Sequence, residues 1–536
     1  MSTDTTDPQP LVPEDVFEAR RRLVNRFHTP DMAFGLGGQR AELVGSLESG
    51  LVLGGLVVID DETGAPLVAQ LQSLQLAEQQ LGEVELVMDA QTYGSTIRNA
   101  TVTPMVRGVR GELLVLGRLR DDVYEPGAPG RGFAESRYRP ATDAEIRLVL
   151  DHRAGTDASL TIGEVLGSAA VPARLRAKGF SRHTFLCGQS GSGKTYATGV
   201  MLERLRLETS LPMLVLDPNS DHVHLGEVRP DASDHPDADR YRAKAGEVLV
   251  ARARGNGGDQ LLAVHFSELA LREQTLLLDL DPVADLDLYA SFVEVVAGLG
   301  GVYSVRDVRD GAAALGHRPG GDLATRIDNL EVADWGMWCR ADEVSFVDVA
   351  PLRYPCVVID LGSLERPEER ILVAMALLEA LWRRRAEKRS MLLVVDEAHN
   401  VFPSHPTNPL EAAGAAVGVA IAAEGRKFGL HLLLATQRPS KVEANVVTQC
   451  DNLALLRVNS STDVEDLCRI FSHVPAGLIR QASEQHQGEV LFAGPVAELP
   501  VRAKVGRRLS PEGGSDLPTD WASGPASSAG LAEVPG

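Results

Sequence analysis

One stretch of the chain has the residue types and spacing of a phosphate-binding loop. Its glycines let successive backbone N–H groups turn toward one anion, and Lys194 adds a positive charge for the β- and γ-phosphates. Thr195 offers a hydroxyl to Mg²⁺, and a helix expected from Tyr196 onward presents its positive N-terminal end. We therefore predict a bound nucleoside triphosphate with Mg²⁺. The loop consists of Gly188, Gln189, Ser190, Gly191, Ser192, Gly193, Lys194 and Thr195.

A second group of chemical interest is the acid pair Asp396 and Glu397, which follows the apolar run 392–395. In a parallel sheet such a pair lies beside the phosphate loop, where Asp396 is expected to hold Mg²⁺ through its water shell. Glu397 is then expected to orient and activate the attacking water. The alternative is an exposed acidic turn, which the presence of the loop disfavours. Two adjacent acids indicate an ATPase that hydrolyses ATP, not a kinase or a small GTPase.

Three further polar residues stand at the ends of predicted strands or helices. Gln437 follows the apolar run 432–435 and is expected to sense the γ-phosphate or to position the water; the alternative is a strand-end cap. Arg426 ends a predicted helix, where a cation is favoured by the helix dipole. It could equally reach the γ-phosphate of a neighbouring subunit. The same two interpretations remain open for Arg182, just before the phosphate-loop strand.

Two other clusters have structural interpretations. The basic run 383–389 stands at the C-terminal end of a predicted helix, so we favour a solvated helix cap over a nucleic-acid site. The loop 219–239 is rich in Asp and His but has no matching second cluster, so we predict no zinc site. No L-S-G-G-Q-like segment lies between the phosphate loop and Asp396, which argues against an ABC-type ATPase.

Composition indicates a soluble globular protein of more than one domain, because 536 residues exceed a single core. The formal net charge of −21 argues against a nucleic-acid-coated protein but leaves room for a narrow basic channel. No apolar run is long enough to span a membrane. The polar, acidic start is unlike a signal peptide, and the five cysteines are scattered. We therefore expect a cytoplasmic protein that does not itself bind a membrane.

The residue pattern predicts an α/β fold preceded by a small all-β domain. Short strands broken by Gly, Asp and Pro indicate a barrel, whereas apolar runs without alternation indicate parallel strands buried on both faces. We predict an acidic, disordered extension with a short helix at 1–34, a β-barrel at 35–125, a linker at 126–155, a RecA-like P-loop ATPase sheet at 156–505 with a helical insertion at about 268–342, and a disordered tail at 506–536.

In combination these motifs resemble the HerA branch of the HerA/FtsK DNA-translocating ATPases, over roughly residues 40–505. The resemblance is carried by the β-rich segment and by motifs spread across the ATPase region. Those motifs are 162–167 leading to Arg182 and the phosphate loop, 216–219 (Leu-Asp-Pro-Asn), 395–399 (Val-Asp-Glu-Ala-His), 424–429 (Glu-Gly-Arg-Lys-Phe-Gly) and 435–439 (Ala-Thr-Gln-Arg-Pro).

The resemblance implies a homo-hexameric ring that threads double-stranded DNA through its centre and hydrolyses ATP as a helicase or translocase. It implies that the β-rich domain is a HAS-barrel that docks a partner, either a nuclease of the NurA type or another effector. The expected setting is DNA-end processing in repair, or antiviral defence. The resemblance also casts Arg426 as a finger acting across the subunit interface and Arg182 as a second arginine that contacts nucleotide.

We therefore expect a Mg²⁺-dependent ATPase that couples hydrolysis to DNA translocation. A nucleotide-gated scaffolding or regulatory ATPase ring, which assembles a partner enzyme without moving along DNA, is the main alternative. The strong acidity favours that alternative, whereas the complete hydrolytic set disfavours it. A membrane secretion or conjugation motor is a third possibility, against which the lack of a spanning segment counts.

Overall fold

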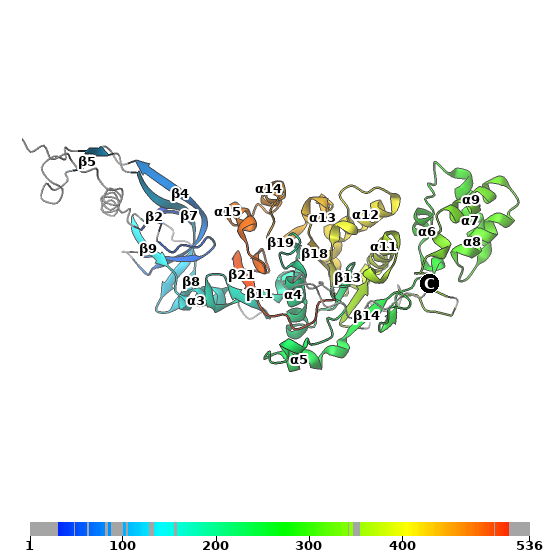
Figure 1. Cartoon of the computed structure of the whole chain (residues 1–536), viewed down its shortest axis with the longest axis horizontal. Helices are drawn as coiled ribbons and strands as arrows, with labels where there is room; N and C mark the ends of the chain where they lie inside the picture. The colour runs from blue at the N-terminus through cyan, green and yellow to red at the C-terminus, as the bar shows by residue number, and fades with distance from the viewer. Residues whose placement is uncertain are drawn as a thin grey trace, which may run out of the picture.

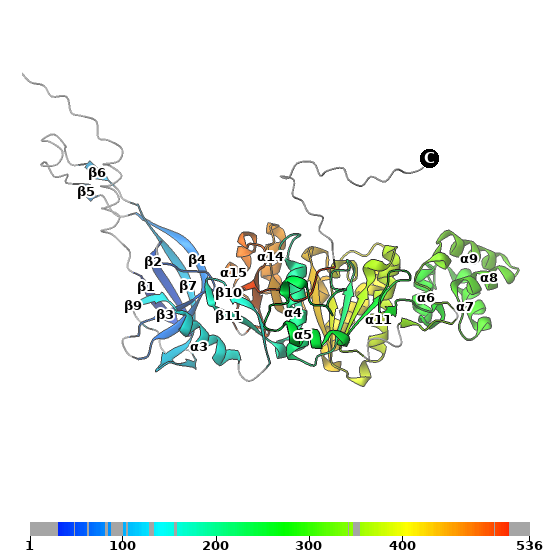
Figure 2. The same cartoon turned by 60° about the horizontal axis from the view of Figure 1, so that its bottom comes forward.

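The computed structural model describes residues 31–513, except 48, 62–63, 81–83, 87–99, 103–104, 128–132, 134, 155–157, 341, 347–353 and 498. Three parts follow one another along the long axis: a β domain, a large sheet flanked by helices, and a group of helices at the far end (Figures 1 and 2). The extension predicted at 1–34, with its short helix, lies almost wholly outside the described residues. So does most of the tail predicted at 506–536.

The N-terminal domain is a closed barrel, as the sequence predicted. Six strands form the ring in the order β2-β1-β9-β3-β4-β7, and pairing of β2 with β7 closes it. Alternate side chains point inward, which buries Leu43, Val57 and Leu113. The barrel strands are β1 (Met32–Gly37), β2 (Arg40–Ser46), β3 (Leu56–Ile59), β4 (Leu67–Gln80), β7 (Met105–Arg120) and β9 (Ser136–Pro140). Strand β8 (Val123–Pro126) pairs antiparallel with the end of β7, and β5 (Val84–Leu86) pairs with β6 (Ala100–Val102).

The stretch 126–155, which we expected to be a linker, contains a barrel strand and a helix. Strand β9 pairs with both β1 and β3, and helix α3 (Asp143–Ala154) follows it. The Pro-, Gly- and Arg-rich composition hides β9, because only Ser136 and Tyr138 face the interior. The barrel is therefore completed by a strand that lies beyond the boundary we predicted for it.

The central sheet has twelve strands in the order β11-β10-β21-β20-β19-β12-β18-β17-β13-β16-β14-β15. The strands from β19 to β15 are parallel, and the four at the other edge are antiparallel, so the predicted α/β sheet is confirmed as a mixed one. The strands are β10 (Ser159–Val165), β11 (Ser168–Arg176), β12 (His183–Cys187), β13 (Met213–Asp217), β14 (Val248–Arg252), β15 (Gln260–Leu261), β16 (Cys356–Asp360), β17 (Met391–Val395), β18 (Leu430–Thr436), β19 (Cys450–Leu455), β20 (Glu489–Ala493) and β21 (Val501–Val505).

Helices cover both faces of this sheet, which explains the unbroken apolar runs of its central strands. Helix α4 (Lys194–Glu208) packs on the face that holds Leu186 and Leu433. Helices α11 (Pro367–Arg383) and α12 (Pro409–Glu424) pack on the opposite face, against Phe185 and Leu432. Every residue of β12, β13, β16 and β17 is buried as a result. The described part of the chain has no helix both long and apolar enough to cross a membrane.

The helical group and the barrel lie at opposite ends of the sheet (Figure 1). The helical group comprises α6 (Leu271–Leu277), α7 (Leu286–Leu299), α8 (Val305–Ala314) and α9 (Arg318–Asn329). The barrel contacts the ATPase part through α15 (Ala476–Arg480), which packs against β4. A Cβ atom at Gly477 would lie 2.7 Å from the carbonyl oxygen of Gln72, so this close approach requires glycine.

The segment 506–513 belongs to the folded core, although we expected the disordered tail to begin at residue 506. It runs from β21 alongside α4 (Figure 1), and Arg508, Leu509 and Ser510 are fully buried. The expectation rested on the Gly-, Ser- and Pro-rich composition farther along. The burial of Arg508 depends on Glu203, a partner about 300 residues earlier in the chain, which composition cannot reveal.

Candidate active site

The phosphate loop, residues 188–195, connects strand β12 to helix α4. Gly191 and Gly193 adopt left-handed conformations, with φ angles of 73° and 93°, which glycine accepts without steric cost. The backbone N–H of Ser192 donates to the carbonyl of Gln189, and Lys194 is the first residue of α4. The loop therefore turns its backbone toward the helix N-terminus, as an anion cradle requires.

The predicted catalytic residues meet because the strands that carry them are neighbours. The order β12-β18-β17-β13 brings four carboxyl ends to one edge of the sheet. There Lys194 donates from Nζ to Asp396 Oδ1 at 2.5 Å and lies 3.2 Å from Glu397 Oε1. Burial alone would lower the pKa of Lys194, but the two carboxylates outweigh it and raise that pKa. Without nucleotide, the Lys194 ammonium group is thus paired with two carboxylates, and a bound phosphate would take their place as its partner.

Glu397 is held by three neighbours and is only 4% exposed. Gln437 donates from Nε2 to Glu397 Oε1 at 2.6 Å, and His399 Nδ1 lies 3.3 Å from Oε2. Burial raises the pKa of Glu397, but the hydrogen bond from His399, the charge of Lys194 and the hydrogen bond from Gln437 outweigh it and lower the pKa to about 2. The carboxylate is therefore ionised at neutral pH, as a group that accepts a proton or a hydrogen bond from water must be. Sequence reasoning assigned no role to His399.

The oxygen atoms suited to Mg²⁺ come from three acids and a hydroxyl. Carboxylate oxygens of Asp217, Asp221 and Asp396 all lie within 4.8 Å of one another. Thr195 Oγ1 lies 3.4 Å from Asp221 Oδ2. Burial raises the pKa of Asp217 to about 7 and that of Asp221 to about 6, with Asp396 adding to both. Because clustered carboxylates are costly to ionise without a cation, the donor set fits a divalent ion with a preference for oxygen.

Sequence reasoning proposed Thr195 and Asp396 as metal-binding residues but did not consider Asp217 and Asp221 for Mg²⁺. Asp217 accepts hydrogen bonds from the backbone N–H groups of Asp221 at 3.0 Å and of His222 at 2.7 Å, so it shapes the loop after β13. The loop 219–239 was considered only for zinc ligands. The available signal was a strand that ends in an acid, with another acid four residues later.

The two arginines expected to act on nucleotide, Arg182 and Arg426, lie elsewhere in this chain. Arg182 donates from Nη1 to Asp451 Oδ2 at 3.1 Å, and Arg426 donates from Nη1 to the same oxygen at 2.9 Å. Arg182 directly precedes β12, Arg426 lies shortly before β18, and Asp451 is the second residue of β19. The phosphate loop follows the other end of β12, about 15 Å away at about 3.3 Å per residue. The chain therefore does not bring either arginine to its own site.

A cavity of about 470 Å³ opens over the phosphate loop, which is the size range of small-ligand sites. Gln437, Lys504 and Glu512 line it together with the loop. A smaller cavity, about 30 Å³, lies at the start of β17 and β18, where Met391 and Leu430 contribute to its wall. It lies at the amino ends of these strands, whereas the phosphate loop lies at the carboxyl ends, so the two cavities do not belong to one site.

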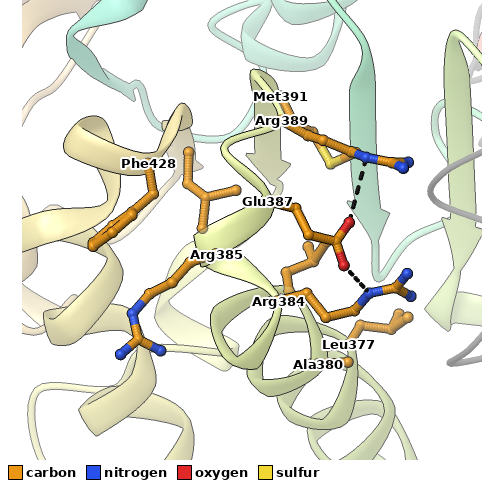
Figure 3. A pocket seen from close by; sticks show the side chains of 10 residues that line it. Leu377, Ala380, Arg384, Arg385, Glu387, Arg389, Met391 and Phe428 are labelled. Atoms are coloured by element: carbon orange, nitrogen blue, oxygen red, sulfur yellow. Dashed lines mark hydrogen bonds and ion pairs between the residues drawn. The ribbon is translucent and has the colours of Figure 1, made fainter.

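The smaller cavity is bordered by the basic run 383–389 (Figure 3). Glu387 accepts from Arg384 at 3.0 Å and pairs with Arg389 at 3.4 Å. The guanidinium of Arg385 lies 4.3 Å from the ring centre of Trp382 and also faces Phe428. These charges thus have local partners at the end of α11, which is the arrangement of a capped helix end.

Comparisons with known proteins agree with this geometry. Residues 160–296 match the family model described as the central domain of the helicase HerA. The chain is 23% identical over 476 residues to the DNA double-strand break repair helicase HerA of Sulfurisphaera tokodaii, covering 86% of this chain and 87% of the relative. It is 24% identical over 410 residues to the protein of the same name from Sulfolobus acidocaldarius, covering 73% and 78%.

Among solved structures, VirB4 of Thermoanaerobacter pseudethanolicus matches with a TM-score of 0.44 and 15% identity, over 66% of this chain and 97% of that one. The sequence matches span both the barrel and the ATPase sheet, and the phosphate loop falls inside the matched central domain. Together with the assembled loop and acid pair, they identify a P-loop ATPase that is similar to the HerA helicases.

Proposed function

We propose that this ATPase is a homo-hexameric motor that moves double-stranded DNA through its central channel. The observation that carries the proposal is the position of Arg182 and Arg426. They lie at the amino ends of the central strands, whereas the phosphate loop lies at the carboxyl ends. Both are partly exposed, at 49% and 36%, and share the carboxylate of Asp451. From there neither arginine reaches the phosphate loop of its own chain, which supports a role at the site of a neighbouring subunit.

Such a contact joins two different surfaces, one with the phosphate loop and one with the arginines. Head-to-tail contacts of this kind close into rings when the rotation between subunits permits. An arginine supplied by a neighbour stabilises the charge that builds up on the transferred phosphoryl group. A ring and an active site shared between two subunits are thus two parts of the same proposal.

Within one subunit, the residues divide the work as follows. Lys194 exchanges its contacts with the two acids for contacts with the β- and γ-phosphates, which releases Glu397 to orient the attacking water. Gln437, bonded to Glu397, is placed to respond to the γ-phosphate. Asp396 and Thr195 would hold Mg²⁺, which neutralises phosphate charge when bound. Hydrolysis thereby changes the contacts of Gln437 at the end of β18, the strand whose other end follows Arg426.

DNA is the substrate that the relatives suggest, since both bear the name of a double-strand break repair helicase. A net charge of −21 restricts duplex binding to a limited surface such as a channel. We further propose that the protein acts in the cytoplasm with a nuclease or another effector, in DNA-end processing or antiviral defence.

Linear duplex DNA is expected to raise the ATP hydrolysis rate of the wild-type protein several-fold. The steady-state rate with and without DNA measures this directly, and Glu397→Gln shows whether the rate belongs to the site described. A rate that linear duplex leaves unchanged, with no DNA binding in a gel-shift assay, contradicts the translocase.

The scaffolding ATPase remains the second candidate, because the net charge of −21 favours a protein partner over DNA. The two functions differ in their need for hydrolysis. If the activity of a partner enzyme survives in Glu397→Gln but is lost in Lys194→Ala, nucleotide binding suffices and the scaffold is favoured. Loss in both variants favours the motor.

A further inference from the structure

We propose that Asp221 is a further oxygen ligand of the Mg²⁺ site and that the segment 506–513, here named the C-terminal strap, holds Asp221 there through Arg508. The inference rests on ATP binding at the phosphate loop and is independent of DNA translocation. It gives a role to a loop and to a segment that the proposed reaction leaves unused.

The position of Asp221 next to Thr195 is built into the loop that follows β13. Its backbone N–H donates to Asp217 Oδ1, and Ser220 before it has a φ of 63°, which turns the chain back toward α4. The Asp221 carboxylate consequently lies 3.4 Å from Thr195 Oγ1. Thr195 Oγ1 is the atom that a phosphate loop uses on Mg²⁺.

A second observation points to a missing partner beside these acids. The ring of His222 is fully buried, and neither ring nitrogen has a hydrogen-bond partner among the described residues. The same holds for Asp396 Oδ2, which lies 3.9 Å from His222 Nε2. Buried polar atoms are nearly always paired, so these atoms remain available to a cation held by the acids or to water bound to it.

The balance of charge around the acids also supports a bound cation. Lys194 is the cation in contact with this acid group, through Asp396 and Glu397. When Lys194 turns to the phosphates, the acids lose that contact just as further negative charge arrives. Buried carboxylates without a counter-charge are strongly disfavoured, and a divalent cation with oxygen ligands restores the balance.

The C-terminal strap connects the two sides of this site. The guanidinium of Arg508 is fully buried, and Nη1 donates to the carbonyl of Thr195 while Nη2 donates to the carbonyl of Asp221, each at 3.4 Å. One rigid, planar group therefore sets the spacing between α4 and the loop after β13. Arg508 acts on the metal site through the backbone, which makes it a positioning residue.

The strap is itself fixed to α4 and to the loop. Glu203 Oε1 accepts from the N–H and the hydroxyl of Ser510 at 2.7 Å each, and Oε2 accepts from the N–H of Leu509 at 2.9 Å. At its end, the N–H of Gly513 donates to the carbonyl of Asp221 at 3.2 Å. A Cβ atom at Gly513 would clash with the carbonyl oxygen of Ser220, so an alanine there must shift the loop or the end of the strap and break their contact.

The first test is the affinity for Mn²⁺, read from the EPR signal of free Mn²⁺ in the presence of a non-hydrolysable ATP analogue and the full-length protein. Asp221→Asn is expected to weaken Mn²⁺ binding about 10-fold, as loss of metal-site groups does. The matched control, Asp239→Asn, removes a carboxylate that is 93% exposed and should leave the affinity unchanged. Unchanged Mn²⁺ affinity in Asp221→Asn overturns the assignment of Asp221.

The second test concerns the strap. Arg508→Lys keeps the charge but cannot span the two carbonyls. Gly513→Ala disturbs the contact between the strap and the loop without altering the side chains of Arg508 and Asp221. Both are expected to weaken Mn²⁺ binding several-fold, while binding of the metal-free analogue is retained. If Arg508→Lys fails to fold, Gly513→Ala alone decides. Wild-type Mn²⁺ affinity in a folded strap variant overturns the role of the strap.

Discussion

Replacing Glu397 by glutamine is expected to lower the ATP hydrolysis rate by about 100-fold or more, which is the usual contribution of a positioned acid–base group. Glutamine keeps the size of the side chain and its hydrogen bond to Gln437, but it cannot accept a proton from the attacking water. Nucleotide binding should persist, because Lys194 and the loop backbone are untouched. The measurement is the steady-state release of phosphate, together with the affinity for a fluorescent ATP analogue.

The matched control is Glu294→Gln, which alters a carboxylate that is 65% exposed in helix α7. It should hydrolyse ATP at the wild-type rate. A Glu397→Gln protein that retains more than about a tenth of the wild-type rate contradicts the assignment of Glu397 as the water-activating group.

Mixing two inactive proteins, Lys194→Ala and Arg426→Ala, is expected to restore ATP hydrolysis. Lys194→Ala loses its own phosphate site but keeps the arginine that it offers to a neighbour, whereas Arg426→Ala keeps the site and loses the arginine. In a randomly mixed ring roughly a quarter of the head-to-tail interfaces combine the two intact halves. The rate of phosphate release across mixing ratios should therefore peak near equal amounts.

The control mixture is Lys194→Ala with Glu397→Gln, in which both lesions lie on the phosphate-loop half. No interface in that mixture has an intact phosphate-loop half, so no activity should return. If the mixture with Arg426→Ala is equally inactive after subunit exchange, Arg426 does not act between subunits. Its contact with Asp451 would then be a local ion pair.

The parts of the site that follow strand ends were predictable from the sequence. Glycine spacing gave the loop, and apolar runs that end in Asp396 and Gln437 located the residues facing it, because parallel strands place their carboxyl ends at one edge. The barrel could be predicted from its short broken strands. Strand β9 could not, since only two of its five side chains face the core.

The residues that sequence reasoning missed depend on contacts between distant segments. Arg508 is buried among two carboxylates, of Glu203 and Glu512, and three backbone carbonyls, most of them from distant segments. Asp221 reaches Thr195 because the left-handed turn at Ser220 redirects the loop. Asp451 has no motif of its own, and its part in holding Arg182 and Arg426 follows from the order of strands β18, β12 and β19.

The most direct test of DNA translocation is displacement of a triplex-forming strand from one end of a linear duplex, followed by gel electrophoresis. The wild-type protein should displace the strand in the presence of Mg²⁺ and ATP, whereas Glu397→Gln should bind the duplex and leave the strand in place. ATP hydrolysis stimulated by the same duplex, with no displacement of the strand, would contradict the motor and favour the scaffolding ATPase.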